Sequence, residues 1–386
     1  MRTRKPKHTR KKKIFHYFDY TLLAILIFLV CFGLIMLYST SAYNGQVDYG
    51  DSFYYFKKQA IITLGCFAVL FFVIRIDYHY YARISKWIFA FSILLMALVQ
   101  TSLGQEVNGA RRWLRIPGIP QFQPSEMAKI AVILFIPVII CKMGKEITTL
   151  SGLIRVLAYG AFASGCVFIL TENLSTAIIV MGITVAMTFV VYPKIAPFLI
   201  TGICGLSVIG IVVMVVSLTA GNSESFRMQR ILVWLKPENY ASGDGYQVLQ
   251  ALYAIGSGGL FGKGLGNSTQ KLGVIPEVQN DMILSIICEE LGVFGAILVL
   301  ALFAFLLYRL LFIAQNAPDL YGSLIATGIF AHIALQVILN VGVVCTLIPN
   351  TGITLPFISY GGTSVVFLIA EMGIALGISR TIVFEE

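Results

Sequence analysis

The sequence predicts an all-α polytopic membrane protein with about ten transmembrane helices. Its 386 residues are 58% hydrophobic and only 12% charged, with a mean hydropathy of +0.84. A soluble domain of this length could not cover its surface with polar groups at that composition. Apolar runs of roughly 20 residues, the length that crosses a bilayer, recur along the chain. Because backbone groups in lipid must be satisfied within the segment, each run is expected to be a helix.

Ten runs are expected to span the membrane. They cover about residues 19–40, 59–76, 85–103, 124–142, 152–170, 174–192, 195–219, 282–312, 320–347 and 355–382. The fifth, sixth and seventh runs are separated only by short polar breaks, so their division is the least marked. The chain thus divides into a basic tail over 1–18 and a ten-helix membrane domain over 19–386.

The basic tail sets the expected orientation. Eight basic residues precede the first run: Arg2, Arg4, Lys5, Lys7, Arg10, Lys11, Lys12 and Lys13. Positive residues stay on the cytoplasmic side, and ten spans return the C-terminus to that side. The first run is too long for a cleavable signal peptide and lacks a small-residue cleavage pattern. We expect the tail to contact anionic lipid and, being short, to bind no nucleic acid.

Three longer polar segments then fall outside, at about 41–58, 104–123 and 220–281, the last being a large loop between the seventh and eighth spans. They carry basic residues against the topological bias: Arg111, Arg112, Arg115, Arg227, Arg230, Lys236, Lys263 and Lys271. Outward positive charge suggests an anionic ligand at the outer surface. Ordinary contact with lipid headgroups would also account for it.

The cysteines and histidines predict no metal site. The seven cysteines all lie in apolar runs without a CxxC spacing, which is typical of small core residues. Of the four histidines, only His332 lies inside a run. Neither a zinc nor a haem arrangement is visible.

The second outer segment carries one group of residues suited to chemistry. Arg111, Arg112, Trp113 and Arg115 form a cationic, aromatic rim, which suits a sugar and a phosphate but equally an interfacial belt. Glu126 and Lys129 follow a helix-starting proline and are three residues apart, so they share a helix face. The alternative is a capping acid and a lysine that extends outward to the membrane surface.

The large outer loop carries the other group. It ends at Asp281, where the eighth run begins, and an acid there is either a helix cap or a reactive group; Asn280 could also cap. Glu289 and Glu290 lie two turns deeper, where a carboxylate usually faces a cavity or a partner. Asp281 and Glu289 are eight residues apart, roughly one helical face. The glycines of 256–266 resemble a phosphate-cradling loop, although close backbone packing also needs glycine.

The motifs follow one another in a fixed order. They are Tyr38-Ser39-Thr40-Ser41, Asn108-Gly109-Ala110-Arg111-Arg112-Trp113, Gln123-Pro124-Ser125-Glu126-Met127-Ala128-Lys129, Gly245-Tyr246-Gln247, Ala254-Ile255-Gly256-Ser257-Gly258-Gly259, Pro276-Glu277 to Asp281, Glu289-Glu290-Leu291-Gly292 and Leu355-Pro356-Phe357-Ile358-Ser359-Tyr360-Gly361-Gly362. Together they resemble the shape, elongation, division and sporulation (SEDS) family of peptidoglycan polymerases, typified by FtsW and RodA. The basic tail and residues 53–59 look more like the FtsW branch, with a RodA-like or sporulation-specific polymerase as the alternative.

Two positions depart from the family pattern. Gln279 and Asn280 stand where the family usually has His-Thr, and Asn173 stands where an aspartate is common. The first departure puts a histidine role beside Asp281 in doubt and leaves the acid in place.

The resemblance implies a processive, inverting glycosyltransferase that polymerises lipid II at the outer face of the membrane. The acceptor GlcNAc 4-hydroxyl would attack C1 of the donor MurNAc, and undecaprenyl pyrophosphate would leave. Asp281 matches the family's essential aspartate and would take the hydroxyl proton, its pKa raised by partial desolvation. Arg111, Arg112 and Lys129 would hold the pyrophosphate. A divalent cation, Mg or Mn, could assist, although no cage of acids is evident.

The resemblance also implies partners and a location. A class B penicillin-binding protein transpeptidase would cross-link the glycan, other divisome membrane proteins would take part, and the division septum is the expected place. Further substrate contacts are expected from Trp113, Glu126, Gln247, Lys263 and Glu290. A lipid II flippase remains an alternative because buried charges also line transport paths, and so does a scaffold that only binds a partner. Against transport, the polar residues crowd the outer half and no inverted repeat is visible.

Overall fold

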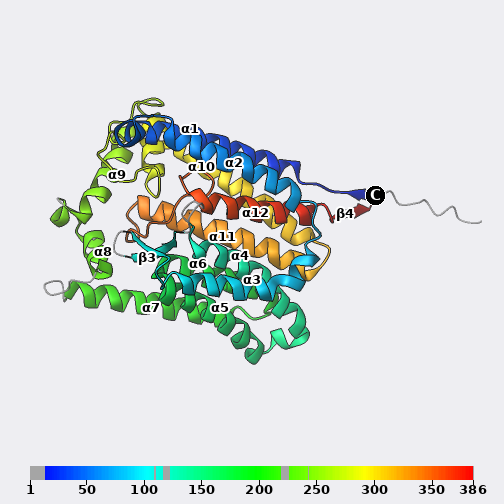
Figure 1. Ribbon diagram of the computed structural model, residues 1–386. Helices are drawn as coiled ribbons and strands as arrows, with labels where there is room; N and C mark the ends of the chain where they lie inside the picture. The colour runs from blue at the N-terminus through cyan, green and yellow to red at the C-terminus, as the bar shows by residue number, and fades with distance from the viewer. Residues whose placement is uncertain (1–13, 108–109, 116–121, 219–225, 242, 386) are drawn as a thin grey trace, which may run out of the picture.

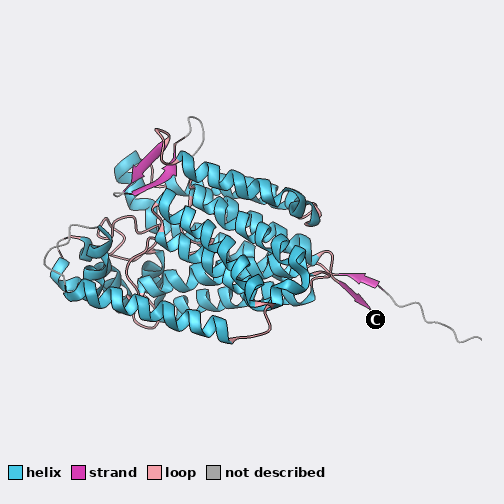
Figure 2. Cartoon of the chain, turned by 90° about the horizontal axis from the view of Figure 1, so that it is seen from below, coloured by secondary structure: helices cyan, strands magenta, loops and turns pink. Residues whose placement is uncertain are grey.

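The computed structural model describes residues 14–107, 110–115, 122–218, 226–241 and 243–385. Within these residues ten helices are long and apolar enough to cross a membrane, which confirms the predicted fold class. The helices lie side by side in one bundle (Figures 1 and 2). Most of the predicted basic tail, residues 1–13, lies outside the described residues.

The ten spanning helices are α1 (Tyr20–Tyr49), α2 (Tyr54–Val73), α3 (His79–Leu98), α4 (Pro124–Met143), α5 (Leu150–Thr171), α6 (Leu174–Val191), α7 (Ala196–Leu218), α10 (Ile283–Asn316), α11 (Leu320–Val344) and α12 (Gly362–Ser379). The shorter elements are β1 (Ile14–His16), β2 (Gly104–Val107), β3 (Ala110–Leu114), η1 (Gly144–Thr148), α8 (Phe226–Leu235), η2 (Pro237–Tyr240), α9 (Asp244–Gly258) and β4 (Val383–Glu385). Strands β2 and β3 form a hairpin in the second polar segment.

The first and last strands of the described residues meet. Strand β1 pairs antiparallel with β4, and Arg309 of α10 donates to Asp19 beside them at 2.8 Å. We call this the terminal end of the bundle. The opposite end, where α8 and α9 lie, is the loop end (Figure 1). An even number of spans requires both chain ends on one side, as observed.

The first helix continues about nine residues beyond the predicted break at residue 40. The hydroxyls of Thr40 and Ser41 donate to the carbonyls of Met36 and Leu37 within the helix, so these polar residues do not end it. The helix stops at Gly50, whose φ of 69° gives the left-handed cap that glycine favours.

The large loop between α7 and α10 is partly helical. It contains α8, η2 and α9, and α9 packs along α10. A Cβ at Gly258 would clash with the carbonyl oxygen of Cys288, and one at Gly262 with that of Glu290. These glycines therefore allow close backbone packing, which favours the packing interpretation of the glycine run over a phosphate cradle.

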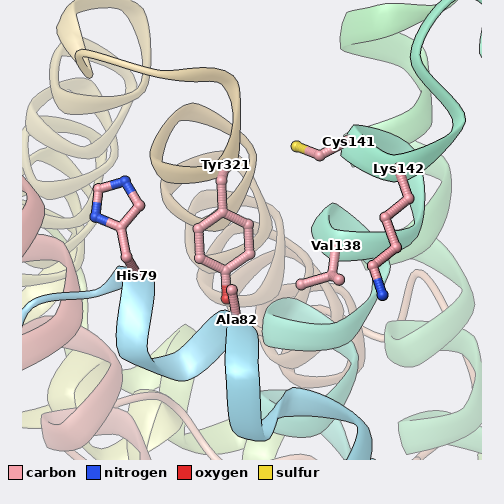
Figure 3. A pocket seen from close by; sticks show the side chains of 6 residues that line it. All are labelled: His79, Ala82, Val138, Cys141, Lys142 and Tyr321. Carbon is pink, nitrogen blue, oxygen red and sulfur yellow. The ribbon is translucent and has the colours of Figure 1, made fainter.

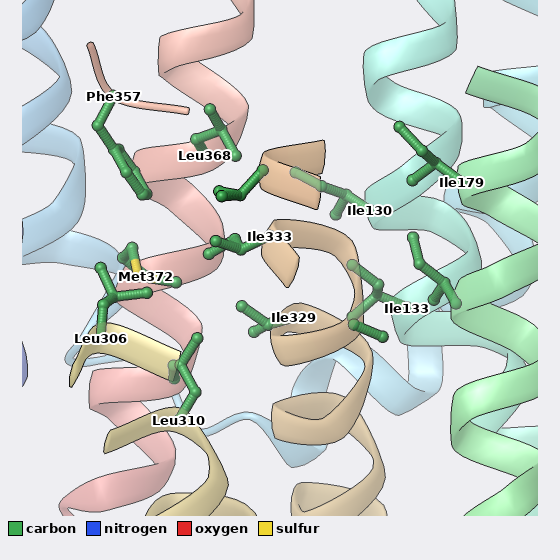
Figure 4. Packing of buried hydrophobic residues seen from close by; sticks show 14 of the residues in the cluster. Ile130, Ile133, Ile179, Leu306, Leu310, Ile329, Ile333, Phe357, Leu368 and Met372 are labelled. Atoms are coloured by element: carbon green, nitrogen blue, oxygen red, sulfur yellow. The ribbon is translucent and has the colours of Figure 1, made fainter. Parts of the chain in front are cut away.

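Helices α11 and α12 form the centre of the core. In the most apolar 18-residue stretch of α11 and of α12, 67% of the residues are buried. In α7 only 7% are buried, so its side chains are available to lipid. Figure 4 shows the apolar side chains that interdigitate between α4, α6, α10, α11 and α12. The labelled residues are Ile130, Ile133, Ile179, Leu306, Leu310, Ile329, Ile333, Phe357, Leu368 and Met372. Two buried amide side chains of α11, Gln336 and Asn340, donate hydrogen bonds to backbone carbonyls of neighbouring segments.

Candidate functional site

Asp281 lies at the loop end, immediately before α10, and is only 8% exposed. The helix N-cap is Met282, and its side chain makes no capping hydrogen bond. Asn280 donates its amide to Glu277 at 2.9 Å instead. The expectation that Asp281 or Asn280 caps this helix is wrong, because Met282 occupies the N-cap position.

The environment of Asp281 favours its protonated form. Burial raises the pKa of Asp281 to about 6, and the nearby Glu277 carboxylate raises it further, while Arg230 and a hydrogen bond from Asn350 act in the opposite direction. A carboxyl group with this pKa changes protonation close to neutral pH. It can therefore accept a proton and release it under physiological conditions.

Two amides on α11 hold the segments around Asp281. Asn340 is fully buried and donates through Nδ2 to the carbonyl oxygens of Asp281, at 2.9 Å, and Ile353, at 2.8 Å. One turn earlier, Gln336 donates to the carbonyl oxygen of Thr354 at 3.0 Å. The segment before α10 and the segment after α11 are thereby fixed to the same helix. Polar residues four apart in an otherwise apolar span were the sequence signal for this pair, and our sequence analysis missed it.

Lys129 is joined to this network. Its Nζ lies 2.9 Å from Oε1 of Glu126 and donates to Gln336 at 3.4 Å. The shared face predicted from their spacing is confirmed. The side chain of Lys129 is only 2% exposed, so the alternative of a lysine extending outward is wrong. Gln336 thus connects the Lys129–Glu126 pair to the 353–354 segment that Asn340 ties to Asp281.

Several buried polar atoms in this region have no protein partner among the described residues. They are Oγ of Ser125, Oε2 of Glu126, Oε1 of Gln279 and Oδ1 of Asn340. Buried polar atoms are nearly always hydrogen-bonded in folded proteins, to water or ligand where protein is not available. Their concentration beside Asp281 and Lys129 marks a place that can receive a polar ligand.

Gln247 reaches the same region from α9. Its Nε2 donates to the carbonyl oxygen of Pro276 at 3.4 Å, and its Oε1 accepts from Asn350 at 3.4 Å. Arg230 of α8 donates to the carbonyl oxygen of Asn350 at 3.2 Å. The helices of the large loop therefore bring a cation, Arg230, and an amide, Gln247, to this region, where Asn350 of the segment after α11 meets them. Asn350 was not among the candidates predicted from sequence.

The cationic rim lies farther along the loop end. Strand β3 packs beside α4 and α5, where Arg112 donates to the carbonyl oxygen of Glu172 at 3.3 Å. Arg111 is half exposed and lies 3.7 Å from the Glu106 carboxylate. Trp113 is half-buried in the same strand. The hairpin thus places these three side chains beside the end of α5, at the loop end.

Glu289 and Glu290 form a separate region. Both are fully buried. Glu289 lies 2.7 Å from Lys263 and accepts from the backbone of Thr269. Glu290 lies 2.7 Å from Lys271 and accepts from Ser39 of α1 at 2.8 Å. The expectation that carboxylates inside a span have partners is confirmed.

The Lys263–Glu289 and Lys271–Glu290 pairs therefore fasten the large loop to α10, and Ser39 adds a contact from α1. The expectation that Asp281 and Glu289 share one helical face is wrong, because Asp281 precedes the helix. The helix is also interrupted just beyond the acids, at Gly292, where φ is 70°.

The described residues contain no group of three or more histidine, cysteine, aspartate or glutamate side chains placed to hold a metal ion. The Glu277 carboxylate raises the pKa of Asp281. A divalent ion at this site would take most of its ligands from substrate phosphates and water rather than from a protein cage.

A shallow pocket opens at the other end of the bundle. It is lined by His79, Ala82, Val138, Cys141, Lys142 and Tyr321, from the start of α3, the end of α4 and the start of α11 (Figure 3). These helix ends lie at the terminal end, a bundle length from Asp281. The pocket is therefore not part of the candidate site.

The fold and this site define an integral membrane protein with a polar site at one end of its helix bundle. The site contains an acid whose pKa is about 6, a buried lysine, and buried polar atoms that have no protein partner among the described residues. The family model described as a cell cycle protein, which covers FtsW, RodA and SpoVE, matches residues 20–382. The chain belongs to this family.

The relatives cover nearly the whole chain. The chain is 40% identical to stage V sporulation protein E of Bacillus subtilis, over 94% of this chain and 97% of that protein. It is 35% identical to a probable peptidoglycan glycosyltransferase FtsW of Trichlorobacter lovleyi, over 94% and 93%. A chain of a peptidoglycan synthase complex, whose structure concerns the coordination of polymerization and crosslinking, superposes with a TM-score of 0.75 at 26% identity, over 94% and 98%.

Proposed function

We propose that this protein is a peptidoglycan glycosyltransferase that polymerises lipid II into glycan strands. Its relatives include proteins named for that activity. The single observation that carries the proposal is Asp281: it is buried, caps no helix, and has a pKa raised to about 6. A carboxylate of that kind at a membrane surface is suited to remove a proton from a sugar hydroxyl.

In the proposed reaction Asp281 is the general base. The 4-hydroxyl of the acceptor GlcNAc loses its proton to the Asp281 carboxylate as its oxygen bonds to C1 of the donor MurNAc. The bond from C1 to the pyrophosphate oxygen breaks on the opposite face, so the anomeric configuration inverts. Asn340 and Asn350 orient Asp281 through its backbone carbonyl and its side chain, which holds the base in place for the attack.

Cations support departure of the pyrophosphate, which gains negative charge as it leaves. Lys129 is buried, carries one counter-ion, Glu126, and is joined through Gln336 to the segment that Asn340 ties to Asp281. Arg230, in the large loop, acts on Asp281 through its positive charge. Arg111 and Arg112 would meet an anion that approaches from outside. A divalent ion, Mg or Mn, held mainly by the pyrophosphate oxygens and water, would add to this charge neutralisation.

The proposal includes an orientation and a location. The loop end faces outward and the terminal end faces the cytoplasm, because the basic tail precedes α1 and basic residues stay inside. Domain boundaries follow: a basic tail over 1–18 and a membrane domain over 19–386 with its outer loop at 220–281. We assign septal wall synthesis as the role, with sporulation-specific or RodA-like synthesis as the alternative.

A class B transpeptidase is the proposed partner. The structural relative belongs to an assembly that joins polymerization with crosslinking, and a polymerase needs a second enzyme to cross-link the strands it makes. Other divisome membrane proteins and anionic lipid at the tail complete the proposed set.

The deciding experiment is polymerisation of purified lipid II in detergent by the protein with its transpeptidase partner. Asp281→Asn retains the shape of the side chain but cannot take a proton. The variant should fold and bind the partner, yet form glycan on the order of 100-fold more slowly. Full activity of this variant would remove Asp281 from the mechanism. Detergent leaves no membrane to flip lipid across, so an inactive wild-type complex would favour a flippase.

A further inference from the structure

Four tyrosine rings form a continuous series of ring contacts from the adjoining ends of α1 and α2 to the loop before α12. Tyr49 and Tyr54 lie parallel with ring centroids 3.8 Å apart. Tyr55 meets Tyr54 edge to face at 5.4 Å, and Tyr360 meets Tyr55 edge to face at 5.4 Å. We call these four residues the aromatic ladder. It joins the α1–α2 turn to the loop before α12.

The aromatic ladder ends against the segment that carries Asp281. The backbone N–H of Tyr360 donates to the carbonyl oxygen of Gln279 at 2.9 Å, two residues before the acid. Lys58 of α2 hydrogen-bonds to the Tyr360 hydroxyl. The aromatic ladder therefore begins beside the candidate site and extends over the loop end. A backbone hydrogen bond, rather than a flexible side chain, connects it to the segment that carries Asp281.

The far end of the aromatic ladder is open. Tyr49 is 55% exposed, and Tyr54, Tyr55 and Tyr360 are half-buried. The turn beside it carries charges of both signs, with Lys57 2.8 Å from Asp51. Tyrosine is enriched at membrane interfaces, but here the four rings contact one another in sequence, and the last of them is bonded through its backbone to Gln279, two residues before Asp281.

We propose that the aromatic ladder binds the glycan strand beside the reaction centre. This inference rests on the proposed function and names where its polymer lies. A pyranose ring has an apolar face of C–H groups and an equatorial rim of hydroxyls. Aromatic rings pack against that face, and tyrosine hydroxyls and Lys58 offer partners for the rim. Stacked tyrosines lose little side-chain entropy on binding because each has few rotatable bonds.

A ladder of this kind would retain a strand between successive additions. A polymerase that holds its product adjacent to the base adds the next unit before the strand dissociates. Removal of the rings should therefore shorten the glycan chains more than it slows formation of the first linkage.

The test is binding of a fluorescent peptidoglycan tetrasaccharide to the full-length protein in detergent. The double variant Tyr49→Ala/Tyr54→Ala should bind about tenfold more weakly than the wild type. Tyr49→Phe/Tyr54→Phe preserves both rings and should remain within about twofold. Phe261→Ala is the matched control, because Phe261 is an 81% exposed ring of the large loop outside the ladder; it should bind as the wild type does.

The outcomes separate this inference from the proposed function. Equal affinities of the wild type and the double alanine variant, an equal loss in Phe261→Ala, or a wild type that binds no tetrasaccharide would overturn the aromatic ladder as a glycan site. Rings that serve only as a lipid belt would give the first of these results. Asp281→Asn should bind the tetrasaccharide normally. If the protein binds the tetrasaccharide through these rings but forms no glycan, the aromatic ladder stands as a glycan site and the proposed polymerase activity is wrong.

Discussion

Asp281 and the Glu289–Glu290 pair lie only eight residues apart, and their surroundings differ in kind. Glu289 and Glu290 are fully buried, and each is within 2.7 Å of a lysine; Glu289 also accepts from the backbone of Thr269, and Glu290 from the hydroxyl of Ser39. Asp281 is almost as buried, but burial outweighs the compensation from Arg230 and Asn350, and its pKa rises to about 6. An acid whose burial is offset by a lysine and hydrogen-bond donors fastens the loop to the helix. An acid whose burial is only partly offset keeps a raised affinity for a proton, which a reaction can use.

The largest expected effect lies in the compensated pair. Glu290→Ala should destabilise the protein by about 3–5 kcal/mol, because it leaves the Lys271 charge buried without its partner. Thermal unfolding in detergent measures the loss. Glu290→Gln/Lys271→Met removes both charges and should recover most of the stability. A stable Glu290→Ala protein that fails only to turn over substrate would instead move Glu290 to the substrate site.

Lys129 tests whether a buried, paired lysine can also serve the reaction. Lys129→Ala should reduce polymerisation about 10- to 100-fold through loss of pyrophosphate contact, and it leaves Glu126 without its partner. Lys129→Met/Glu126→Gln keeps the volume and removes both charges, so stability should recover while lipid II turnover stays low. Substrate titration provides the measurement. Wild-type turnover in the double variant would make the pair purely structural.

Asn340 tests the positioning of the acid. Asn340→Ala leaves the carbonyls of Asp281 and Ile353 without their donor, at a cost of about 1–3 kcal/mol. Because the base is then free to shift, the rate should fall about tenfold, with the substrate concentration for half-maximal rate little changed. Asn316→Ala is the matched control, since that asparagine donates to Phe312 at the terminal end. A purely structural role predicts lower stability with an unaltered rate per folded molecule.

The smallest effect is on pH dependence. If Asp281 is the base, the rate should be half-maximal at about pH 6 and rise to a plateau above it. The effect on stability has the opposite sign: the raised pKa means that the charged form opposes folding above pH 6, and this opposition fades as pH falls towards 4.

Asp281→Asn should consequently raise the unfolding temperature at pH 8 more than at pH 5. Parallel rate and unfolding profiles of both proteins supply the check. A wild-type rate that is flat from pH 5 to pH 8 would contradict a titrating base in this range.

Much of the architecture followed from the sequence because lipid imposes rules that act locally. Apolar length determines a span, so all ten helices were predicted, and the i, i+3 spacing was sufficient to pair Glu126 with Lys129. Errors arose where side-chain hydrogen bonds decided a boundary. The first span was predicted to end at about residue 40, yet the hydroxyls of Thr40 and Ser41 bond within the helix, and α1 continues to Tyr49.

The sequence by itself therefore determined that the protein lies in a lipid bilayer, how many spans it has and which acids are candidates. Composition and the length of apolar runs follow directly from what lipid tolerates. Only the tertiary structure decided which acid is compensated. Lys263 and Lys271 reach Glu289 and Glu290 across a folded loop, and Asn340 of α11 meets Asp281 from 59 residues away. Burial and pairing depend on atoms brought together by the fold, and these two quantities set the pKa that distinguishes Asp281 from its neighbours.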